Sequence, residues 1–465
     1  MKKYEIGRTD EGYEILVGSD YTDLLVDFVL NTNYDNIPEE SIDIAKQAII
    51  DSVGVIYAAV AEPMKNPALA YLDSCETEKQ ATVIGINRKT SMVNAAFING
   101  CFNHCIDFDD CCFPAVSHST TTYLGTMLAI GEHMHLTGKD MIVAYVIGHE
   151  VYNKIAGVLN PECWYSGHHA TGIFGTVAAA AVGGKLMGLD RQQLKWAIGI
   201  ACSSASGLKV NLGSMTKPYH AGHSCEIGVQ AAILAKNGFT SRDNALEGRM
   251  GYGDLYARGN PHFEVLEELG KIWDVIVRPP FMKPHPSCGG THAAMNAIRL
   301  LKKKHGITPD MVEKIEMGTN PGSFEQLIYP DPKDPYEARF SATYTCAVAM
   351  VKDRWGIANH TQEVLDDPEI QAMMKKVHLY IDDEITQKVP LGYVDLMSRI
   401  RITLTDGRVF QMDGKYPILS WDEVFQKYCE CCSLVIPEEQ YVKSYNLMKD
   451  LENLDDVAIL MEQLS

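Results

Sequence analysis

The chain has 465 residues, 41 Lys and Arg against 60 Asp and Glu, and therefore a formal net charge of −19. Its 46% hydrophobic and 22% charged residues are typical of a globular protein and exclude a disordered or fibrous one. The negative charge argues against nucleic acid as the main partner, because phosphate binding needs a clustered basic face. A small anionic substrate needs only a local group of cations and remains compatible with this composition.

Thirteen cysteines without regular spacing argue against a secreted disulfide framework. The first residues, Met1 to Glu5, lead into charged and polar residues and not into an apolar signal core. The longest run of small apolar residues, 172–184, is shorter than the ~20 helical residues that cross a bilayer. We therefore expect no membrane partner and a cytoplasmic location.

From about residue 20 to about residue 265 the pattern is helical, with no strand between the helices. Two stretches, residues 171–188 and 227–235, are rich in Ala and Gly, which allows close helix packing in the centre of a large bundle. Gly188 is typical of a helix end. Three helix starts share a capping-box pattern: Asn36 with Glu39, Asp190 with Gln193, and Thr240 with Asp243.

After about residue 270 the pattern becomes mixed. Residues 292–304 predict a helix, and residues 272–277 form an apolar run typical of a strand. Further strands are predicted at residues 314–319, 378–382, 399–405 and 408–412, the last two joined by a hairpin. From Ser420 the pattern is helical again. We therefore expect a mainly α fold, in which a large discontinuous helical domain (residues 1–268 and 416–465) carries an inserted α+β lid domain (residues 269–415).

Four short segments combine ionisable residues with Gly or Pro turns, where a pocket wall is more plausible than a core stripe. They are residues 104–118, 166–172, 213–223 and 283–292. In the first, Asp107, Asp109 and Asp110 place three carboxylates within four residues. These would repel one another if all were buried and ionised, so either they are solvated or one of them holds a proton.

The other three segments supply imidazoles and cations. His169 precedes a predicted helix, where exposed backbone N–H groups can hold a carboxylate. Lys217 comes before Pro218, which is expected to hold it out of the helical register. The last segment opens the next helix with Lys283, Cys288 and His292. Taken singly, each segment could instead be a solvated loop, a structural histidine or a domain connector.

A metal site was tested because Cys101, His104, Cys105, Cys111, Cys112 and His118 are crowded together. Their spacing matches neither the paired C-x2-C frame of structural zinc nor the C-x2-C-x2-C run of an iron–sulfur cluster, so we predict no metal. No Walker loop, G-x-G-x-x-G turn or nucleophile elbow is present, and we expect no nucleotide cofactor and no acyl-enzyme chemistry.

Taken together, these segments resemble the MmgE/PrpD family of 2-methylcitrate dehydratase, cis-aconitate decarboxylase and iminodisuccinate epimerase, over about residues 20–420. The pieces that carry the resemblance are, in chain order, Asp107-Phe-Asp-Asp110 with His118, His169-Ala-Thr-Gly172 with the Ala/Gly-rich stretch to Gly188-Leu-Asp190, Met215-Thr-Lys-Pro-Tyr-His220, Gly238-Phe-Thr240, Pro286-Ser-Cys-Gly-Gly-Thr-His292 and Glu337-Ala-Arg-Phe-Ser341. Cys111 stands where a threonine is common, and Cys288 where the decarboxylase branch has a histidine.

The resemblance implies a large all-α domain with an α+β lid, usually as a homodimer, and a cofactor-independent site between the domains. It also implies which residues serve that site. The expected catalytic residues are Asp107, His118, His169 and Lys217, and the expected substrate-binding residues are His220, Lys283, Cys288, His292 and Tyr329, the last as a lid tyrosine.

This set of residues suits a di- or tricarboxylate substrate. Lys217 and a protonated histidine can stabilise the enediolate-like charge that develops when a C–H bond next to a carboxylate breaks. His169 or His118 can take or return the proton, and Asp107 can orient that imidazole or protonate a leaving hydroxyl.

The leading hypothesis is a lyase that dehydrates a 2-hydroxy di- or tricarboxylate of the 2-methylcitrate type. The alternatives are, in order, a proton-transfer epimerase, a cis-aconitate decarboxylase, a non-catalytic helical binding protein and a zinc-binding structural protein.

Overall fold

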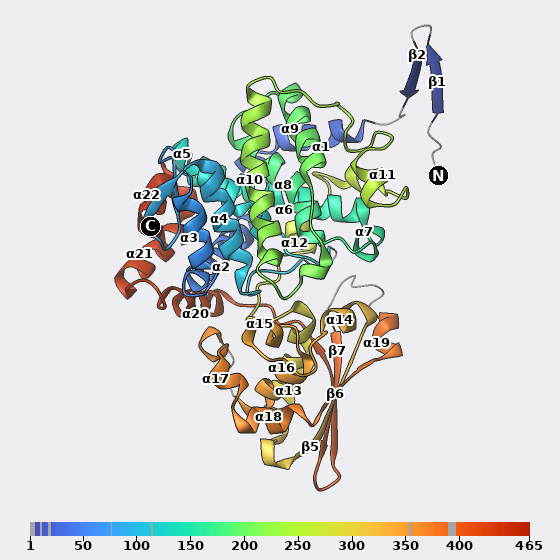
Figure 1. Cartoon of the computed structure of the whole chain (residues 1–465), viewed down its shortest axis with the longest axis vertical. Helices are drawn as coiled ribbons and strands as arrows, with labels where there is room; N and C mark the ends of the chain where they lie inside the picture. The colour runs from blue at the N-terminus through green and yellow to red at the C-terminus, as the bar shows by residue number, and fades with distance from the viewer. Residues whose placement is uncertain are drawn as a thin grey trace.

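The computed structural model describes residues 5–9, 12–16, 20–75, 77–112, 115–352, 356–388 and 397–465. Most of these residues are helical, and strands form only small sheets (Figure 1), which confirms the predicted mainly α class. The prediction that no signal core follows Met1 concerns in part residues 1–4, which lie outside the described residues. Two short strands, β1 (Glu5–Thr9) and β2 (Gly12–Leu16), pair antiparallel before the first helix.

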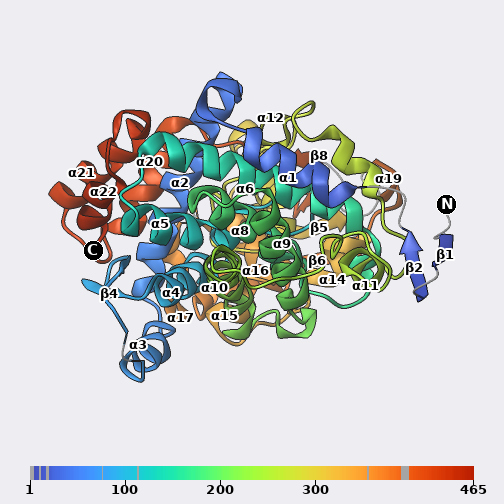
Figure 2. The same cartoon turned by 90° about the horizontal axis from the view of Figure 1, so that it is seen from above.

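The helices of the first part of the chain pack around one large hydrophobic core. In chain order they are α1 (Tyr21–Asn31), α2 (Glu39–Val60), α3 (Lys65–Asp73), α4 (Met92–Cys105), α5 (Leu124–His133), α6 (Gly138–Leu159), α7 (Glu162–Tyr165), α8 (Ala170–Leu186), α9 (Arg191–Ser204), α10 (Thr216–Lys236), α11 (Tyr252–Tyr256) and α12 (Asp274–Val277). Seen from above, α4, α6, α8 and α10 lie near the centre, with α8 packed between α6 and α10 (Figure 2).

Small residues bring α4 and α10 into close contact. A Cβ atom on Gly100 of α4 would lie 2.8 Å from Cys225 Sγ and 2.9 Å from the Cα of Gly222, both on α10. Any side chain at Gly100 would therefore push α4 and α10 apart. The predicted use of Gly and Ala for close helix packing applies here, next to His104 on α4 and His220 on α10.

A second hydrophobic core forms from residues 288–412. It contains a four-stranded sheet in the order β6 (Val377–Ile381), β5 (Val312–Thr319), β7 (Met397–Leu404), β8 (Val409–Lys415). β5 pairs parallel with β6, and the β5–β7 and β7–β8 pairs are antiparallel. The helices of this part are α13 (Gly289–His305), α14 (Pro321–Gln326), α15 (Pro335–Ala338), α16 (Ala342–Val351), α17 (Gln362–Leu365), α18 (Pro368–Met374) and α19 (Asp383–Lys388).

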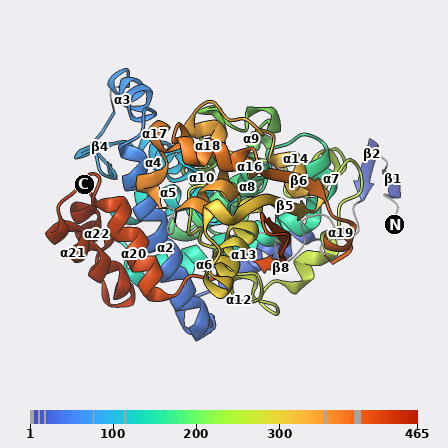
Figure 3. The same cartoon turned by 90° about the horizontal axis from the view of Figure 1, so that it is seen from below.

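The sheet buries one face against helices. Along β7, Ile400, Ile402 and Leu404 are at most 1% exposed, and they alternate with residues that are more exposed, the period of two that a half-buried strand requires. α13 packs on β7 and β8, and α16 packs on β6 and on α13. Figure 3 shows α13, α16 and α18 on this underside of the molecule. Whether this part acts as a lid remains a prediction.

The C-terminal helices lie against the first core and far from the sheet (Figure 1). They are α20 (Trp421–Cys432), α21 (Glu438–Lys449) and α22 (Val457–Leu464). α20 packs on α2, and α22 packs on α5. The domain boundaries expected at residues 268/269 and 415/416 remain predictions.

Several local predictions are confirmed. Asp190 caps α9 in a capping box with Gln193, and Gly188, with φ +64°, follows the end of α8. The predicted helix at residues 292–304 is α13, and the predicted strands at residues 314–319, 378–382, 399–405 and 408–412 correspond to β5, β6, β7 and β8.

Other local predictions are wrong. Asn36 closes a 3₁₀ turn capped by Asn33, and α2 begins only after Pro38. Thr240 and Asp243 start no helix, because turns follow from residue 243. Asp274–Val277 is a single helical turn and not a strand, and no strand in the described part of the chain pairs with it. The helical region also contains an unpredicted hairpin of β3 (Ala81–Val83) and β4 (Arg88–Thr90), too short to show alternation.

Within the described ranges, no single helix has the length and hydropathy of a membrane span. Only α2 and α3 taken together pass that test, and they are bent by 86° at their junction.

Candidate active site

A cleft with about 610 Å³ of empty space lies where the two hydrophobic cores meet. Residues from both parts of the chain line it: Asp107, Cys111, Val116, Ser117, His118, Trp164, His169, Thr171, Lys209, Leu212, Lys217, Cys288, Gly289, Gly290, Gln326 and Phe340. All four predicted catalytic residues and Cys288 are therefore brought together at one cleft.

Asp107 is the charged centre of one wall. It follows the end of α4 with φ +54°, a left-handed conformation that Asp tolerates better than most residues. Its carboxylate forms an ion pair with Lys217 and lies 3.2 Å from Lys283 Nζ, which also donates to the Asp107 carbonyl at 2.8 Å. Burial alone would raise the pKa of Asp107, but Lys217 and Lys283 hold it well below its usual value. The carboxylate is therefore ionised.

Lys217 lies inside α10, in the first turn, so the prediction that Pro218 holds it out of the helical register is wrong. Proline is accepted here because the backbone N–H groups of a first turn have no partner within the helix. The helix start thus fixes the position from which Lys217 reaches Asp107.

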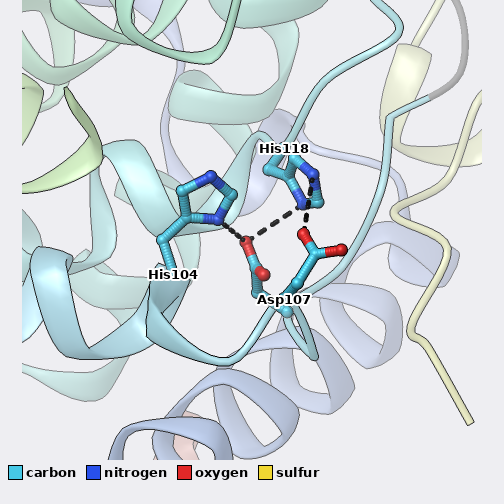
Figure 4. A group of neighbouring side chains, drawn as sticks. His104, Asp107 and His118 are labelled. Carbon is cyan, nitrogen blue, oxygen red and sulfur yellow. Dashed lines mark hydrogen bonds and ion pairs between the residues drawn. The ribbon is translucent and has the colours of Figure 1, made fainter. Parts of the chain in front are cut away.

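Two histidines share a second carboxylate behind Asp107 (Figure 4). His104 Nδ1 lies 2.8 Å from Asp109 Oδ2, and His118 Nδ1 lies 3.1 Å from the same oxygen. His118 Nδ1 is also 2.9 Å from the carbonyl oxygen of Asp110, while its Nε2 points to Asp107 Oδ1 at 3.6 Å. Burial lowers the pKa of His104 to about 3 and also lowers that of His118, so both rings are neutral donors to an ionised Asp109.

Asp110 is the member of the acidic run whose pKa is raised, whereas those of Asp107 and Asp109 are lowered. It is fully buried and accepts hydrogen bonds from Thr120 at 2.9 Å and from Ser119 at 3.2 Å. Burial, followed by the charge of Asp109, raises the pKa of Asp110 to about 7. All three carboxylates are buried, so the alternative of a solvated acidic loop is wrong and the alternative of one protonated carboxyl is supported.

The second histidine pair, His169 and His220, has no carboxylate partner among the described residues. His169 is the N-cap residue of α8, as predicted for a histidine at a helix start, and its Nδ1 lies 2.9 Å from Nδ1 of His220. One of these nitrogens must carry the hydrogen, so the rings adopt complementary tautomers. Burial lowers the pKa of His169 well below its usual value and that of His220 to about 4. Both rings are therefore neutral.

Among the neighbouring histidines, the structure separates those at the cleft from those outside it. The ring of His168 lies 5.0 Å from the ring of Tyr256, and His223 Nδ1 is 2.7 Å from Glu226. Neither belongs to the described lining of the cleft, whereas His169 does and His220 stands directly behind it.

The remaining predicted substrate-binding residues lie at different depths. Cys288 Sγ is 3.3 Å from Gln326 Oε1 in the cleft wall, and burial raises the pKa of its thiol to about 11. Lys283 and His292 stand behind the lining, His292 between the carbonyls of His285 at 3.1 Å and Cys288 at 3.2 Å. The hydroxyl of Tyr329 lies against Gly213, beside the cleft.

Two family models match this chain. The MmgE/PrpD N-terminal domain matches residues 23–264, and the MmgE/PrpD C-terminal domain matches residues 285–452. The chain belongs to the MmgE/PrpD family. The resemblance predicted from short motifs is thereby confirmed.

Curated MmgE/PrpD relatives are similar over most of their length. Cis-aconitate decarboxylase of Mus musculus is 26% identical over 90% of this chain and 88% of its own. The decarboxylase of Aspergillus terreus (strain NIH 2624 / FGSC A1156) is 25% identical over 94% of both chains. 2-Methylcitrate dehydratase of Salmonella typhimurium is 24% identical over 85% of this chain and 84% of its own. The relatives' names are those of lyases, which supports an enzyme.

The cleft of this MmgE/PrpD chain also contains residues that sequence analysis did not select. Ser117 lies within the first predicted segment and Thr171 within the second, so a finer analysis of those segments could have found them. Phe340 belongs to the Glu337–Ser341 motif. Trp164, Lys209, Leu212 and Gln326 come from other parts of the chain and carried no motif.

The histidines and aspartates around Asp107 form a donor set that could hold a metal. One ligand atom from each of His104, Asp107, Asp109 and His118 lies within 4.8 Å of the others. However, the ammonium groups of Lys217 and Lys283 already contact Asp107, so two positive charges oppose a cation there. The residues fit a charge-compensated acid/base site better than a metal site.

Proposed function

We propose that this chain is a lyase that dehydrates a 2-hydroxy di- or tricarboxylate of the 2-methylcitrate type by acid/base catalysis, without a cofactor. One observation carries the proposal. His118, placed between two carboxylates, and His169, placed against a neutral imidazole, line the same cleft. An elimination needs a base for the C–H proton and an acid for the leaving hydroxyl. Both rings are neutral at rest, but only His118 has carboxylates beside it that would stabilise an added proton.

The cleft offers several groups to bind the substrate carboxylates. Lys217 lies in its wall, and α8 and α13, of 17 residues each, begin at it. Among the described residues, neither helix start is capped by a side-chain hydrogen bond, so the first N–H groups are available to an anion. The same groups and Lys217 stabilise the enediolate-like charge formed by removal of the C–H proton.

His169 is the proposed base. Its Nδ1 is engaged with His220, so Nε2 is the nitrogen that remains for a substrate. When His169 Nδ1–H donates to His220, Nε2 carries a lone pair and can accept the C–H proton. The low pKa of His169 in its buried setting keeps that lone pair free near neutral pH.

His118 is the proposed acid. A proton on its Nε2 would lie between the ring and Asp107, while Nδ1–H donates toward Asp109 and the Asp110 carbonyl. The negative charges of a bound polycarboxylate favour this protonated form. Asp107 is itself ionised against two lysines, so we assign it the orienting role and not the delivery of a proton to the leaving hydroxyl.

Two further activities use the same groups. Decarboxylation of an unsaturated tricarboxylate needs a proton donor such as His118, and the sequence is 25–26% identical to cis-aconitate decarboxylases. Epimerisation needs two acid/base groups on one carbon, which His118 and His169 also supply. The expected homodimer belongs to the same proposal and is tested by light scattering after size exclusion.

Proton NMR in deuterium oxide tests the proposal. Purified enzyme is mixed in turn with citrate, 2-methylcitrate, cis-aconitate and aspartate-derived dicarboxylates. A new unsaturated product from a saturated hydroxy acid, seen as a vinyl C–H signal or as a methyl group on a double bond, supports dehydration. Loss of carbon dioxide from cis-aconitate would show decarboxylation instead of dehydration. Entry of deuterium alone would show epimerisation instead. A folded protein that changes none of these compounds would contradict the proposal and favour a binding protein.

A further inference from the structure

The charges around Asp107 largely cancel one another. Asp107 and Asp109 are opposed by Lys217 and Lys283, and the surrounding imidazoles are neutral. Among the described lining residues, Lys209 is the other cation. Its nearest carboxylate partner in the described structure is Glu325, at 3.9 Å with a side chain 54% exposed, a distance and exposure at which an ion pair contributes little.

Backbone pairing fixes Lys209 beside the proposed base. The N–H of Lys209 donates to the Gly167 carbonyl at 2.9 Å, and the N–H of His169 donates to the Gly207 carbonyl at 3.1 Å. His168 and Leu208 form a β-bridge between these hydrogen bonds. Lys209 and His169 therefore enter the same cleft from two adjacent, mutually bonded segments.

The side chain of Lys209 is held without being neutralised. Its Nζ lies 3.7 Å above the ring of Trp164, which is 8% exposed and lines the same cleft. A cation over an indole face is attracted by the ring quadrupole, yet it keeps its N–H donors and its full charge. Burial lowers the pKa of the Lys209 ammonium, a cost that an anionic ligand would offset.

We infer that Lys209, seated on Trp164, binds one carboxylate of the substrate next to His169 and gives the enzyme a preference for tricarboxylates over dicarboxylates. Lys217 and the starts of α8 and α13 provide for the other carboxylates, and Lys209 adds a further cationic position. This inference rests on the proposed function, because it assumes a polycarboxylate substrate in this cleft.

The test measures binding, so it does not depend on turnover. Propane-1,2,3-tricarboxylate and glutarate have the same carbon chain, and neither carries a hydroxyl group to eliminate. Calorimetry compares their Kd values for the wild type, Lys209→Met, Lys209→Arg and Lys271→Met. Lys271 is exposed and lies outside the cleft, so Lys271→Met is the control that removes the same charge. Thermal unfolding confirms that each variant is folded.

We expect Lys209→Met to weaken tricarboxylate binding by about tenfold or more, and to weaken glutarate binding less, because one charged hydrogen bond is lost. Lys209→Arg should restore part of the preference, and Lys271→Met should leave it unchanged. If Lys209→Met binds the tricarboxylate as tightly as the wild type, or if Lys271→Met loses as much affinity as Lys209→Met, the role of Lys209 is overturned while the proposed function stands. If the wild type binds neither acid, the proposed function fails as well.

Discussion

The two histidines at the cleft, His118 and His169, differ in what stands behind them. His118 lies between the carboxylates of Asp107 and Asp109, at 3.6 Å and 3.1 Å. Behind His169 is the ring of His220, at 2.9 Å between the two Nδ1 atoms. Burial lowers the pKa of both His118 and His169, but only His118 has carboxylates that would stabilise an added proton.

This difference supports the two roles that we propose for one residue type in one site. A carboxylate at the distal nitrogen stabilises an imidazolium, whereas a neutral imidazole there fixes a tautomer without adding charge. The wall of His118 is built from buried charges that must stay balanced, and the wall of His169 from neutral groups. The four predictions below test this difference, the first two by substitutions on each wall.

The largest expected effect is on turnover, and it distinguishes the proposed acid, His118, from the proposed base, His169. His169→Asn should lower kcat about a hundredfold to ten-thousandfold and abolish deuterium exchange at the substrate carbon, because the base is lost. His118→Asn should lower elimination by a similar factor but retain exchange, since only the acid is missing. NMR in deuterium oxide records both rates, and His168→Asn is the matched control outside the cleft. Equal loss of exchange in both variants would refute the assignment.

Stability should also distinguish the two walls. Asp107→Asn leaves Lys217 and Lys283 buried without their partner, so we expect a loss of about 3 to 5 kcal/mol in the free energy of unfolding. His220→Asn removes only a neutral hydrogen bond and should cost about 1 kcal/mol. Urea titration measures both, with the exposed Asp455→Asn as the control. A smaller loss for Asp107→Asn than for His220→Asn would contradict the charge balance described above.

A pH effect of intermediate size is expected for the neutral wall. Burial lowers the pKa of His220 from 6.5 to about 4, so below pH 6.5 the unfolded chain takes up a proton that the folded chain does not. Stability from the neutral ring is therefore present above pH 6.5 and is lost as the pH falls toward 4. The stability advantage of the wild type over His220→Asn should shrink over that range in urea titrations. An advantage that grows on acidification would show that the ring is protonated in the folded state.

The smallest expected effect concerns metals. Since Lys217 and Lys283 contact Asp107, chelator treatment should leave activity and unfolding midpoint unchanged. Elemental analysis before and after treatment shows whether an ion was present. If activity were lost on chelation and restored by one divalent metal, the residues around Asp107 would form a metal site and not a charge-balanced one.

The sequence alone determined the helical class, the four strands of the larger sheet, several of the helices, and the segments that form the candidate site. It did so where the signal is local: Asp190 and Gln193 lie within one helical turn, and β7 shows the alternation of a sheet with one buried face. Where the deciding contact is distant, local patterns misled, as at residues 272–277, where an apolar run contains a helical turn that pairs with none of the described strands.

Only the tertiary structure decided the ionisation of the acidic run and the surroundings of the histidines. Asp107, Asp109 and Asp110 are close in sequence, yet their ionisation depends on Lys217, Lys283, His118 and Thr120, which come from other segments. Likewise, Lys427 of α20 donates to the carbonyl of Phe108 at 2.7 Å from more than three hundred residues away. Burial and the distance between charges set pKa values, and neither quantity exists until the chain has folded.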